Sequence, residues 1–377
     1  MAYVSPQELC NILVEFLRCF SYNDDARLPI SDFHVIHAHV STFFPQDQKI
    51  AESMCEYVHA TFPFLPLEIR KAVAIYDTYQ MAVDDVDVEE HDSLSGLCHQ
   101  LAAGIKLQHN WWQDFFRWIP QLLQFYGNYS QATLFRGAIE FLQATAVERT
   151  LFRGYHGSKF PDYIRRMSAQ GPVQAALCFP EDQFPQQKYL PVLASMEAEL
   201  EDFVGTVNDL FSFYKEINNT AVDLINYPLN ASACSGKKPV EVLREISGVA
   251  LDCQFRLQAM LKRLGDQKVE QRMNDFLVGY VRYHLACDRY RILDLCIESG
   301  DCDLWSYYNM SRRAVGKLTS DSLPTGTKTR KLQLLRWTNN RENTAATWSR
   351  SVLVVFLAMV VLGIRRVPHD EITIAAT

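Results

Sequence analysis

Apolar residues recur at intervals of three and four over most of the first 318 positions, which is the spacing of one face of an α-helix. Alternating β-branched runs, the pattern of strands, are rare. Pro and Gly separate several of the periodic segments, as at Phe62-Pro63 and Tyr227-Pro228. The pattern predicts helices over 6–20, 47–60, 66–86, 92–106, 129–150, 187–217, 237–264, 267–298 and 303–317. We therefore expect one all-α domain, a helical bundle, over residues 1–318.

The character of the chain changes beyond residue 318. Nine Lys or Arg and only two acids occur from 311 to 350, which predicts a disordered basic linker over 319–350. Residues 351–364 are all small or apolar, but these fourteen residues are fewer than the roughly 20 that a membrane-spanning helix needs. Two interpretations of 351–377 stay open. In the first, the segment is a tail that associates weakly with a membrane through 351–364 and the flanking cations. In the second, it is a divergent extension without a membrane role.

Composition narrows the class of protein. The chain has 377 residues, 48% of them hydrophobic, and its 37 Lys and Arg against 44 Asp and Glu give a net charge of -7. This excludes wholesale disorder, and a mildly acidic chain lacks the basic surface that nucleic-acid binding needs. The ten cysteines form no Cys-x-x-Cys pair, which is typical of reduced thiols in a cytoplasmic protein. The N-terminus lacks the basic region and cleavage site of a signal peptide.

A run of acids follows the apolar helical segment 72–83. It begins with Asp84 and Asp85 and continues to Asp92. Acids at the C-terminal end of a helix oppose its dipole, so helix stability does not explain them. Carboxylates held at the end of a buried helix repel each other unless a cation lies among them, and hard oxygen ligands select Mg²⁺ or Ca²⁺. The alternative is a solvated acidic loop.

A second group of oxygen-bearing side chains lies within 207–216. Asn208, Ser212 and Glu216 are spaced by four residues, so they share one stripe of a helix. An amide oxygen, a hydroxyl and a carboxylate suit Mg²⁺, which keeps several waters and takes phosphate oxygens as its other ligands. Asp209 is one position off the stripe and points about 100° away. The alternative is an ordinary amphipathic helix.

Cations make up a third group. They are Arg165-Arg166, Lys215, and Arg289 and Arg291 in the string Asp288-Arg289-Tyr290-Arg291. Guanidinium groups match phosphate oxygens in pairs, although a surface salt-bridge network would use the same residues. Together the three groups predict a pocket in which metal ions and cations stabilise a departing diphosphate, while aromatic rings stabilise the allylic cation that remains.

At this point the sequence resembles the fungal trichodiene synthase family of class I sesquiterpene cyclases, which includes longiborneol synthase-like members. The string Asn208-Asp209-x-x-Ser212-x-x-x-Glu216 is similar to the second metal motif of that class. The resemblance also rests on matching strings in order and spacing over roughly 70–300, namely Ile164 to Met167, Pro180 to Phe184, Tyr283-His284 and Asp288 to Arg291.

The resemblance implies an all-α terpenoid synthase fold with a deep apolar cavity, and a carbon–oxygen lyase activity. The enzyme would use three Mg²⁺ ions, with Mn²⁺ able to substitute, to ionise farnesyl diphosphate. It would release diphosphate and form a cyclic sesquiterpene hydrocarbon or alcohol, and it would be a homodimer. The implied roles are metal binding for Asp84, Asp85, Asn208, Ser212 and Glu216; diphosphate binding for Arg165, Lys215, Arg289 and Tyr290; and catalysis for Asp84, Arg289 and Tyr290.

Two departures from the family pattern stand out. Val88 occupies the fifth position of the first motif, where the family has an acid, which puts one metal contact in doubt. The basic motif has Asp-Arg-Tyr-Arg where the family has Asp-Arg-Arg-Tyr-Arg, so one arginine is missing. Both departures leave ionisation in place and leave the product open.

Three other functions fit the sequence less well. A chain-elongating prenyl diphosphate synthase needs two similar aspartate-rich motifs, and the sequence has one. A ferritin-like di-iron protein needs two Glu-x-x-His units, and Glu56-x-x-His59 supplies one. A catalytically impaired helical scaffold, or a binding protein anchored by its tail, would not need the intact oxygen trio and cations.

Overall fold

The computed structural model describes residues 4–85, 96–107, 110–148, 150, 152–218 and 226–318. The side chains of residues 83–85, 110 and 302 are not among those described. The chain divides into two compact units, Met1–Leu323 and Pro324–Thr377, and every residue of the second lies outside the described ranges. The basic linker and the apolar segment 351–364 predicted above therefore fall on residues that the structure does not describe.

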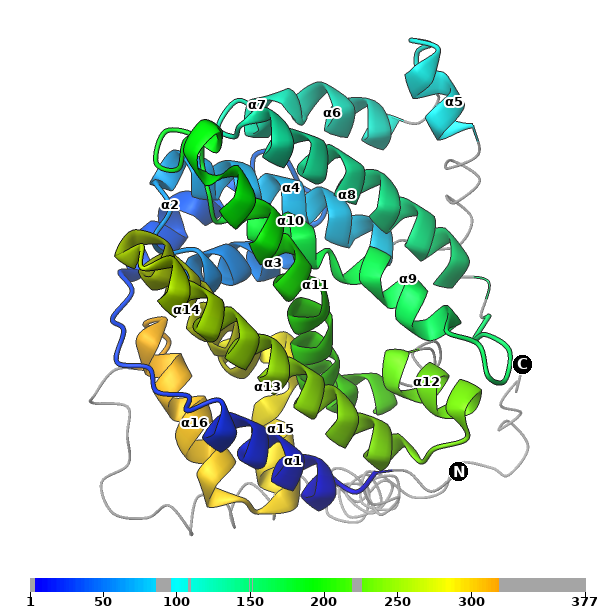
Figure 1. Cartoon of the computed structure of the whole chain (residues 1–377), viewed down its shortest axis with the longest axis vertical. Helices are drawn as coiled ribbons and strands as arrows, with labels where there is room; N and C mark the ends of the chain where they lie inside the picture. The colour runs from blue at the N-terminus through cyan, green and yellow to red at the C-terminus, as the bar shows by residue number, and fades with distance from the viewer. Residues whose placement is uncertain are drawn as a thin grey trace, which may run out of the picture. The chain divides into compact units, whose positions relative to one another are not determined.

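Every regular element in the described ranges is a helix, which confirms the predicted all-α class (Figure 1). The helices are α1 (Pro6–Cys19), α2 (Ile30–Val40), α3 (Gln48–Thr61), α4 (Leu67–Asp85), α5 (Leu97–Ala102), α6 (Asn110–Trp118), α7 (Pro120–Leu123), α8 (Asn128–Glu148), α9 (Phe160–Ala169), α10 (Gly171–Leu177), α11 (Gln186–Ile217), α12 (Tyr227–Ser235), α13 (Pro239–Leu264), α14 (Gln267–Ala286), the 3₁₀ turn η2 (Asp288–Tyr290), α15 (Ile292–Ser299) and α16 (Cys302–Ala314). None of the helices in the described part of the chain combines the length and the apolarity needed to cross a bilayer.

The longest helix, α11, forms the spine of the bundle. It packs most extensively against α13 and the short α10, and it also contacts α9 and α14 (Figure 1). Gly171 lets α10 lie directly on it, because a Cβ at that position would overlap the carbonyl oxygen of Leu200. Phe203, Leu210 and Phe211 are fully buried, so this helix is enclosed on most of its faces.

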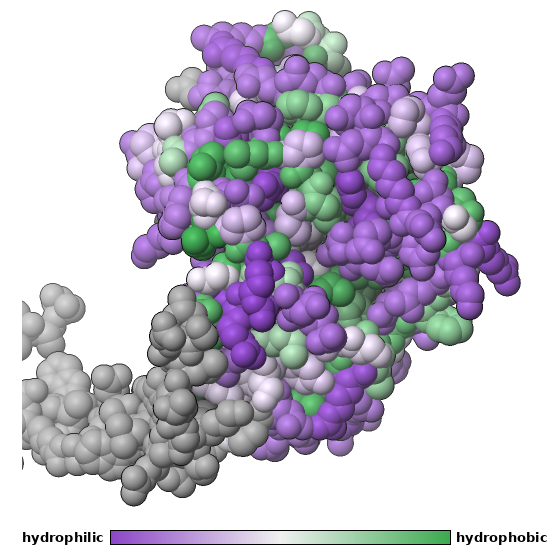
Figure 2. All heavy atoms as spheres, turned by 90° about the vertical axis from the view of Figure 1, so that its left-hand side faces the viewer, coloured by the Kyte–Doolittle hydropathy of each residue, from purple (hydrophilic) through white to green (hydrophobic). Residues whose placement is uncertain are grey.

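Side chains at the helix starts satisfy backbone N–H groups that would otherwise lack a partner. Ser5 and Glu8 form a capping box at α1, in which the Ser5 hydroxyl accepts from the Glu8 N–H at 3.2 Å and the Glu8 carboxylate accepts from the Ser5 N–H at 3.1 Å. Asp266 and Asp301 cap α14 and α16 in the same sense. On the face shown in Figure 2, polar residues predominate and apolar residues are scattered among them. The apolar faces of the helices are thus turned inward.

One prediction about the helices was wrong. The periodic segment 267–298 was expected to be continuous, but α14 ends at Ala286 and Cys287 is extended. The turn η2 follows, and Arg291 has a positive φ of 55° before α15 begins. The reason lies in α16, where Nη1 of Arg312 donates to the Ala286 carbonyl at 3.2 Å and to the Asp288 carboxylate at 2.5 Å. A cation that binds the last carbonyl of one helix and the first acid of the next turn stabilises the break.

Two carboxyl groups, those of Asp24 and Asp77, are buried in the helical unit and differ in their ion-pair partners. Asp24 accepts from Nε and Nη2 of Arg282 on α14, at 2.6 and 2.9 Å, and from the Tyr22 hydroxyl at 3.0 Å. Nη1 of the same arginine donates to the Ala60 carbonyl of α3 at 2.8 Å. The side chains of this ion pair are only 6% and 1% exposed, so the pair ties the segment after α1 to α3 and α14 without contact with water.

Asp77 of α4 pairs with no cation among the described residues. Its Oδ2 atom is buried without a hydrogen bond to any described residue, and burial raises the pKa of its carboxyl to about 8. The neighbouring hydroxyls of Tyr57 and Tyr280 donate elsewhere, to Gln174 at 2.5 Å and to the Val204 carbonyl at 3.0 Å. Asp77 is therefore protonated in the folded chain at neutral pH.

We expect the replacement Asp24→Ala to lower the free energy of unfolding by about 3–5 kcal/mol, because it leaves the Arg282 charge buried and unpaired. Glu245→Ala is the control: it removes an exposed pair with Lys237 at 2.7 Å and should cost less than about 1 kcal/mol. Urea unfolding followed by circular dichroism measures both. Equal losses in the two variants would contradict the role given to the buried pair.

Asp77 predicts a pH dependence of stability. An unfolded Asp titrates near its ordinary value of about 3.9, so the unfolded chain releases this proton from about pH 4, whereas the folded chain keeps it up to about pH 8. The group therefore makes folding less favourable as pH rises through that window. The variant Asp77→Asn has no ionisable group at this position. We therefore expect its melting temperature to exceed that of the wild type by a margin that grows from pH 5 to pH 8. Parallel pH profiles for the two proteins would rule the assignment out.

Candidate active site

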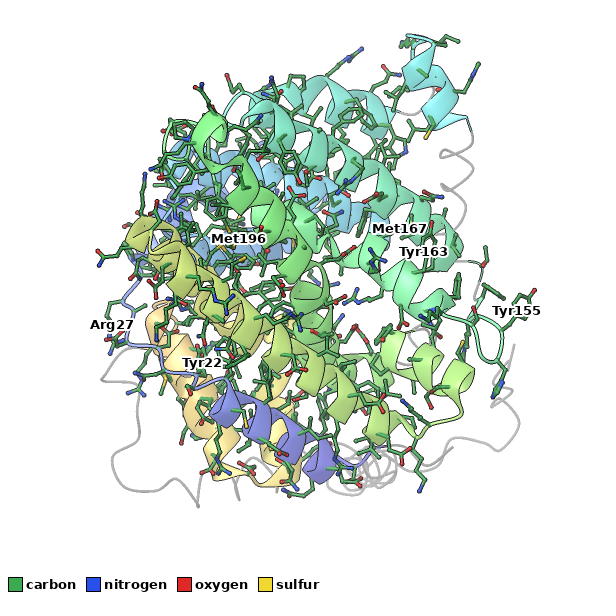
Figure 3. The ribbon with its side chains drawn as sticks, viewed as in Figure 1. Tyr22, Arg27, Tyr155, Tyr163, Met167 and Met196 are labelled. Carbon is green, nitrogen blue, oxygen red and sulfur yellow. The ribbon has the colours of Figure 1, made fainter. Side chains whose placement is uncertain are left out.

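A buried cluster of polar side chains lies where α9, α11 and α14 meet. Arg165 comes from α9, the helix marked by Tyr163 and Met167 in Figure 3. Its Nε donates to Asp209 at 3.0 Å, and its Nη2 donates to the Asn208 Oδ1 at 2.9 Å and to the Gly205 carbonyl at 3.2 Å. One guanidinium therefore binds two successive side chains of α11 and fixes how that helix faces α9.

Asp209 keeps the charge of Arg165 paired inside the protein. Its side chain is 5% exposed. Burial raises the pKa of the Asp209 carboxyl, and the adjacent guanidinium opposes that rise. The sequence had placed Asp209 off the stripe of oxygen ligands, as an anchor of the helix. In the structure it holds Arg165 and leaves the oxygen stripe to its neighbours.

The amide of Asn208 connects α11 to α14 and to η2. Its Nδ2 lies 3.2 Å from Nε2 of His284 and donates to the Tyr290 hydroxyl at 3.2 Å. Tyr290 is 4% exposed and packs against His284 with ring centroids 4.5 Å apart. The structure thus brings together three residues that the sequence predicted as separate parts of the site: Arg165, Asn208 and Tyr290.

The other two oxygen ligands predicted on α11 lie one and two turns further along the helix. The Ser212 hydroxyl and Oε2 of Glu216 are both buried, and neither has a hydrogen-bond partner among the described residues. The remaining Glu216 oxygen, Oε1, lies 3.7 Å from Nζ of Lys215. Two buried oxygen atoms left without partners on one helical stripe are unfavourable unless something binds them.

These residues fit a hard cation. A carboxylate oxygen, a hydroxyl and the second lone pair of the Asn208 Oδ1 supply the oxygen donors that Mg²⁺ prefers. Within the described ranges, no three His, Cys, Asp or Glu side chains converge on one point.

The predicted acids of the first motif stand at the end of α4. The backbone of that helix continues to Asp85, but the side chains of Asp84 and Asp85 lie outside the described residues, as does Val88. One contact locates this end of the helix. Nη2 of Arg289, on η2, lies 3.6 Å from Sδ of Met81, which precedes Asp84 by less than one turn. The break after α14 thus places the predicted diphosphate ligand Arg289 beside the last turn of α4.

Two cations of the predicted group face elsewhere. Arg166 pairs with Glu201 at 2.7 Å, and its side chain is 55% exposed. Arg291 pairs with Asp294 at 2.9 Å and lies over the ring of Tyr214. Both are surface interactions of the kind that stabilises a fold weakly. Among the described residues, the predicted cations that lie beside the oxygen stripe are Arg165 and Lys215. Arg289 lies beside the last turn of α4.

The two residues of the Glu-x-x-His unit on α3 make an ion pair and an aromatic contact, while neither ring nitrogen of His59 has a hydrogen-bond partner among the described residues. Glu56 pairs with Lys317 at 2.5 Å, and the buried ring of His59 packs edge-on against Phe33 with centroids 6.0 Å apart. Burial lowers the pKa of His59 to about 4, so its ring is neutral. These residues line a small surface pocket together with Cys287 and Val315. The contacts favour a structural role for both residues.

His284 belongs to the cluster, but the motif analysis gave it no role. It is fully buried on α14, and burial lowers its pKa to about 3. The string Tyr283-His284 contributed to the family resemblance, yet no spacing rule connects residue 284 to residue 208. The pairing could be found only from the packing of α14 on α11.

Comparison with known proteins finds relatives over most of the chain. A family model described as trichodiene synthase (TRI5) matches residues 5–307. The chain is 26% identical to a trichodiene synthase of Paramyrothecium roridum over 231 residues, which are 60% of this chain and 59% of that protein. It is 26% identical to that of Fusarium acaciae-mearnsii over 305 residues, 77% of this chain and 81% of the relative. For Gibberella zeae the identity is 28% over 232 residues, 61% of each chain. The match to the first of these relatives thus spans less than two thirds of its length.

Proposed function

The chain belongs to the trichodiene synthase family, and from this premise we propose that it is a sesquiterpene cyclase. Its substrate would be farnesyl diphosphate and its cofactor Mg²⁺. The reaction would break the bond between C1 and the diphosphate oxygen, with the electron pair leaving on diphosphate. The allylic cation that remains would cyclise and end by losing a proton or capturing water. In reaction class this is a carbon–oxygen lyase acting on a phosphate ester.

One observation carries the proposal beyond family membership. The two buried oxygen atoms of Ser212 and Glu216 have no partner among the described residues, and they lie on the same helix face as Asn208. A scaffold that had lost its activity would gain stability by replacing such atoms, since each unsatisfied buried polar group costs roughly 1–3 kcal/mol. Their presence beside Lys215 and the Arg165 cluster supports a site that binds a metal ion and an anion.

We assign roles to the residues of this chain as follows. Asn208, Ser212 and Glu216 would hold Mg²⁺ from the α11 side, and Asp84 and Asp85 would hold it from the α4 side. Bound there, Mg²⁺ would neutralise charge on the leaving diphosphate. The diphosphate ligands would be Arg165, Lys215, Arg289 and Tyr290. The family alone suggests three Mg²⁺ ions, Mn²⁺ as a substitute, and a homodimer.

Arg165 and Tyr290 each keep a donor for an anion without breaking the cluster. Arg165 keeps Nη1 for a ligand, since its contact with the Ser168 hydroxyl is long at 3.5 Å. Tyr290 accepts from Asn208, which leaves its own O–H proton to donate. Aromatic rings lining the substrate cavity would stabilise the cation that forms next.

Incubation of the full chain with farnesyl diphosphate and Mg²⁺ tests the proposal directly. We expect release of diphosphate together with a cyclic C15 product detected by gas chromatography and mass spectrometry, and no release when EDTA is present. A chain-elongating enzyme would instead lengthen the substrate when isopentenyl diphosphate is added. Absence of diphosphate release with either Mg²⁺ or Mn²⁺ would refute the proposed function.

Glu216→Gln should lower turnover at least about 10- to 100-fold, or yield aberrant products, because the amide replaces a charged metal ligand by a neutral one. The matched control is Glu199→Gln on the same helix. The Glu199 carboxylate pairs with Arg256 at 2.9 Å, and this pair lies away from the cluster. Its turnover should stay within about twofold of the wild type. Steady-state kinetics over a range of Mg²⁺ concentrations compares the two variants. Equal turnover and product ratios in Glu216→Gln and wild type would remove Glu216 from the site.

A further inference from the structure

The ring of His284 is enclosed by aromatic side chains from three elements. Its centroid lies 4.6 Å from that of Tyr280, 4.5 Å from that of Tyr290 and 5.7 Å from that of Phe211. The residue has no exposed surface. Its orientation is therefore set by packing, and each ring nitrogen meets one polar neighbour.

The first neighbour determines which nitrogen carries the proton. Nδ1 lies 2.8 Å from the backbone carbonyl oxygen of Tyr280, one turn earlier on α14. A carbonyl oxygen only accepts, so Nδ1 must carry the hydrogen and donate it. The Tyr280 hydroxyl in turn donates to the Val204 carbonyl of α11 at 3.0 Å, which holds this turn of α14 in place.

The second neighbour is the amide of Asn208. In a neutral ring with the proton on Nδ1, Nε2 has a lone pair and can only accept. The group that faces it at 3.2 Å must therefore be the Nδ2 amide nitrogen. The opposite orientation would set the amide oxygen against a lone pair and the amide N–H groups against the Arg165 guanidinium.

We propose that His284 is a positioning residue that fixes the Asn208 amide with its oxygen toward the metal and diphosphate side of the cluster. The inference rests on the proposed function. In this role His284 touches neither metal nor substrate. It acts because a misoriented amide would present N–H groups, which cannot bind a cation, where an oxygen ligand is needed.

Two substitutions separate this role from simple packing. In His284→Gln the side-chain oxygen can take the place of Nε2 as the acceptor for Asn208. In His284→Asn the amide reaches only the position of Nδ1, so the contact with Asn208 is lost. Both variants remove the ring and should lower the melting temperature by similar amounts.

The measurement is calorimetric binding of inorganic diphosphate in the presence of Mg²⁺, which needs no turnover. We expect His284→Asn to bind about 10- to 100-fold more weakly than the wild type and His284→Gln to stay within about threefold. Thermal melts establish that each variant is folded. The control is His59→Asn, which alters an equally buried histidine on α3 and should leave binding unchanged.

The outcomes are distinct. Wild-type affinity in folded His284→Asn, or equal losses in the Asn and Gln variants, would overturn the positioning role and leave the proposed function standing. Absence of Mg²⁺-dependent diphosphate binding in the wild type would overturn the proposed function and this inference with it.

Discussion

The guanidinium of Arg165, whose side chain is 21% exposed, is the constraint on which the candidate site depends. A charge largely shielded from water is best paired, and Asp209 pairs it at 3.0 Å while Asn208 and the Gly205 carbonyl accept from Nη2. These contacts determine which side of α11 faces α9. Once that rotation is set, the stripe from Asn208 to Glu216 faces the same side, and helical geometry leaves it no other direction.

The remaining polar groups of the cluster follow from this arrangement. The Asn208 amide has donors left over after binding Arg165, and it uses them on Tyr290 and His284. The oxygens of Ser212 and Glu216 lie further along, where no described residue reaches them. The polar atoms around Asn208 thus have hydrogen-bond partners, whereas the Ser212 hydroxyl and Oε2 of Glu216 have none among the described residues. This division is what a metal site requires, because its ligands must be held in place yet remain unpaired.

The sequence predicted the parts of the site that depend on local periodicity. Asn208, Ser212 and Glu216 could be placed on one stripe because a single helix contains them, and α11 spans 186–217 as expected from 187–217. The break at Cys287 could not be predicted, since no Gly or Pro marks it and Arg312 stabilises it from another helix. Short helices were missed for a different reason. Pro228 resembles a boundary between helices in the sequence, but it lies in the first turn of α12, where proline is favourable.

The anchoring of η2 by α16 has a consequence for synthesis on the ribosome. Asp288 is held by Arg312, which follows it by most of two helices, and Lys317 lies 3.9 Å from the same carboxylate. A nascent chain that has emerged only as far as α15 contains Arg289 and Tyr290 but lacks the cation that ends α14 in front of them. Assembly of this part of the candidate site therefore waits for nearly all of residues 4–318 to leave the exit tunnel, so the growing polypeptide cannot complete it until α16 has docked.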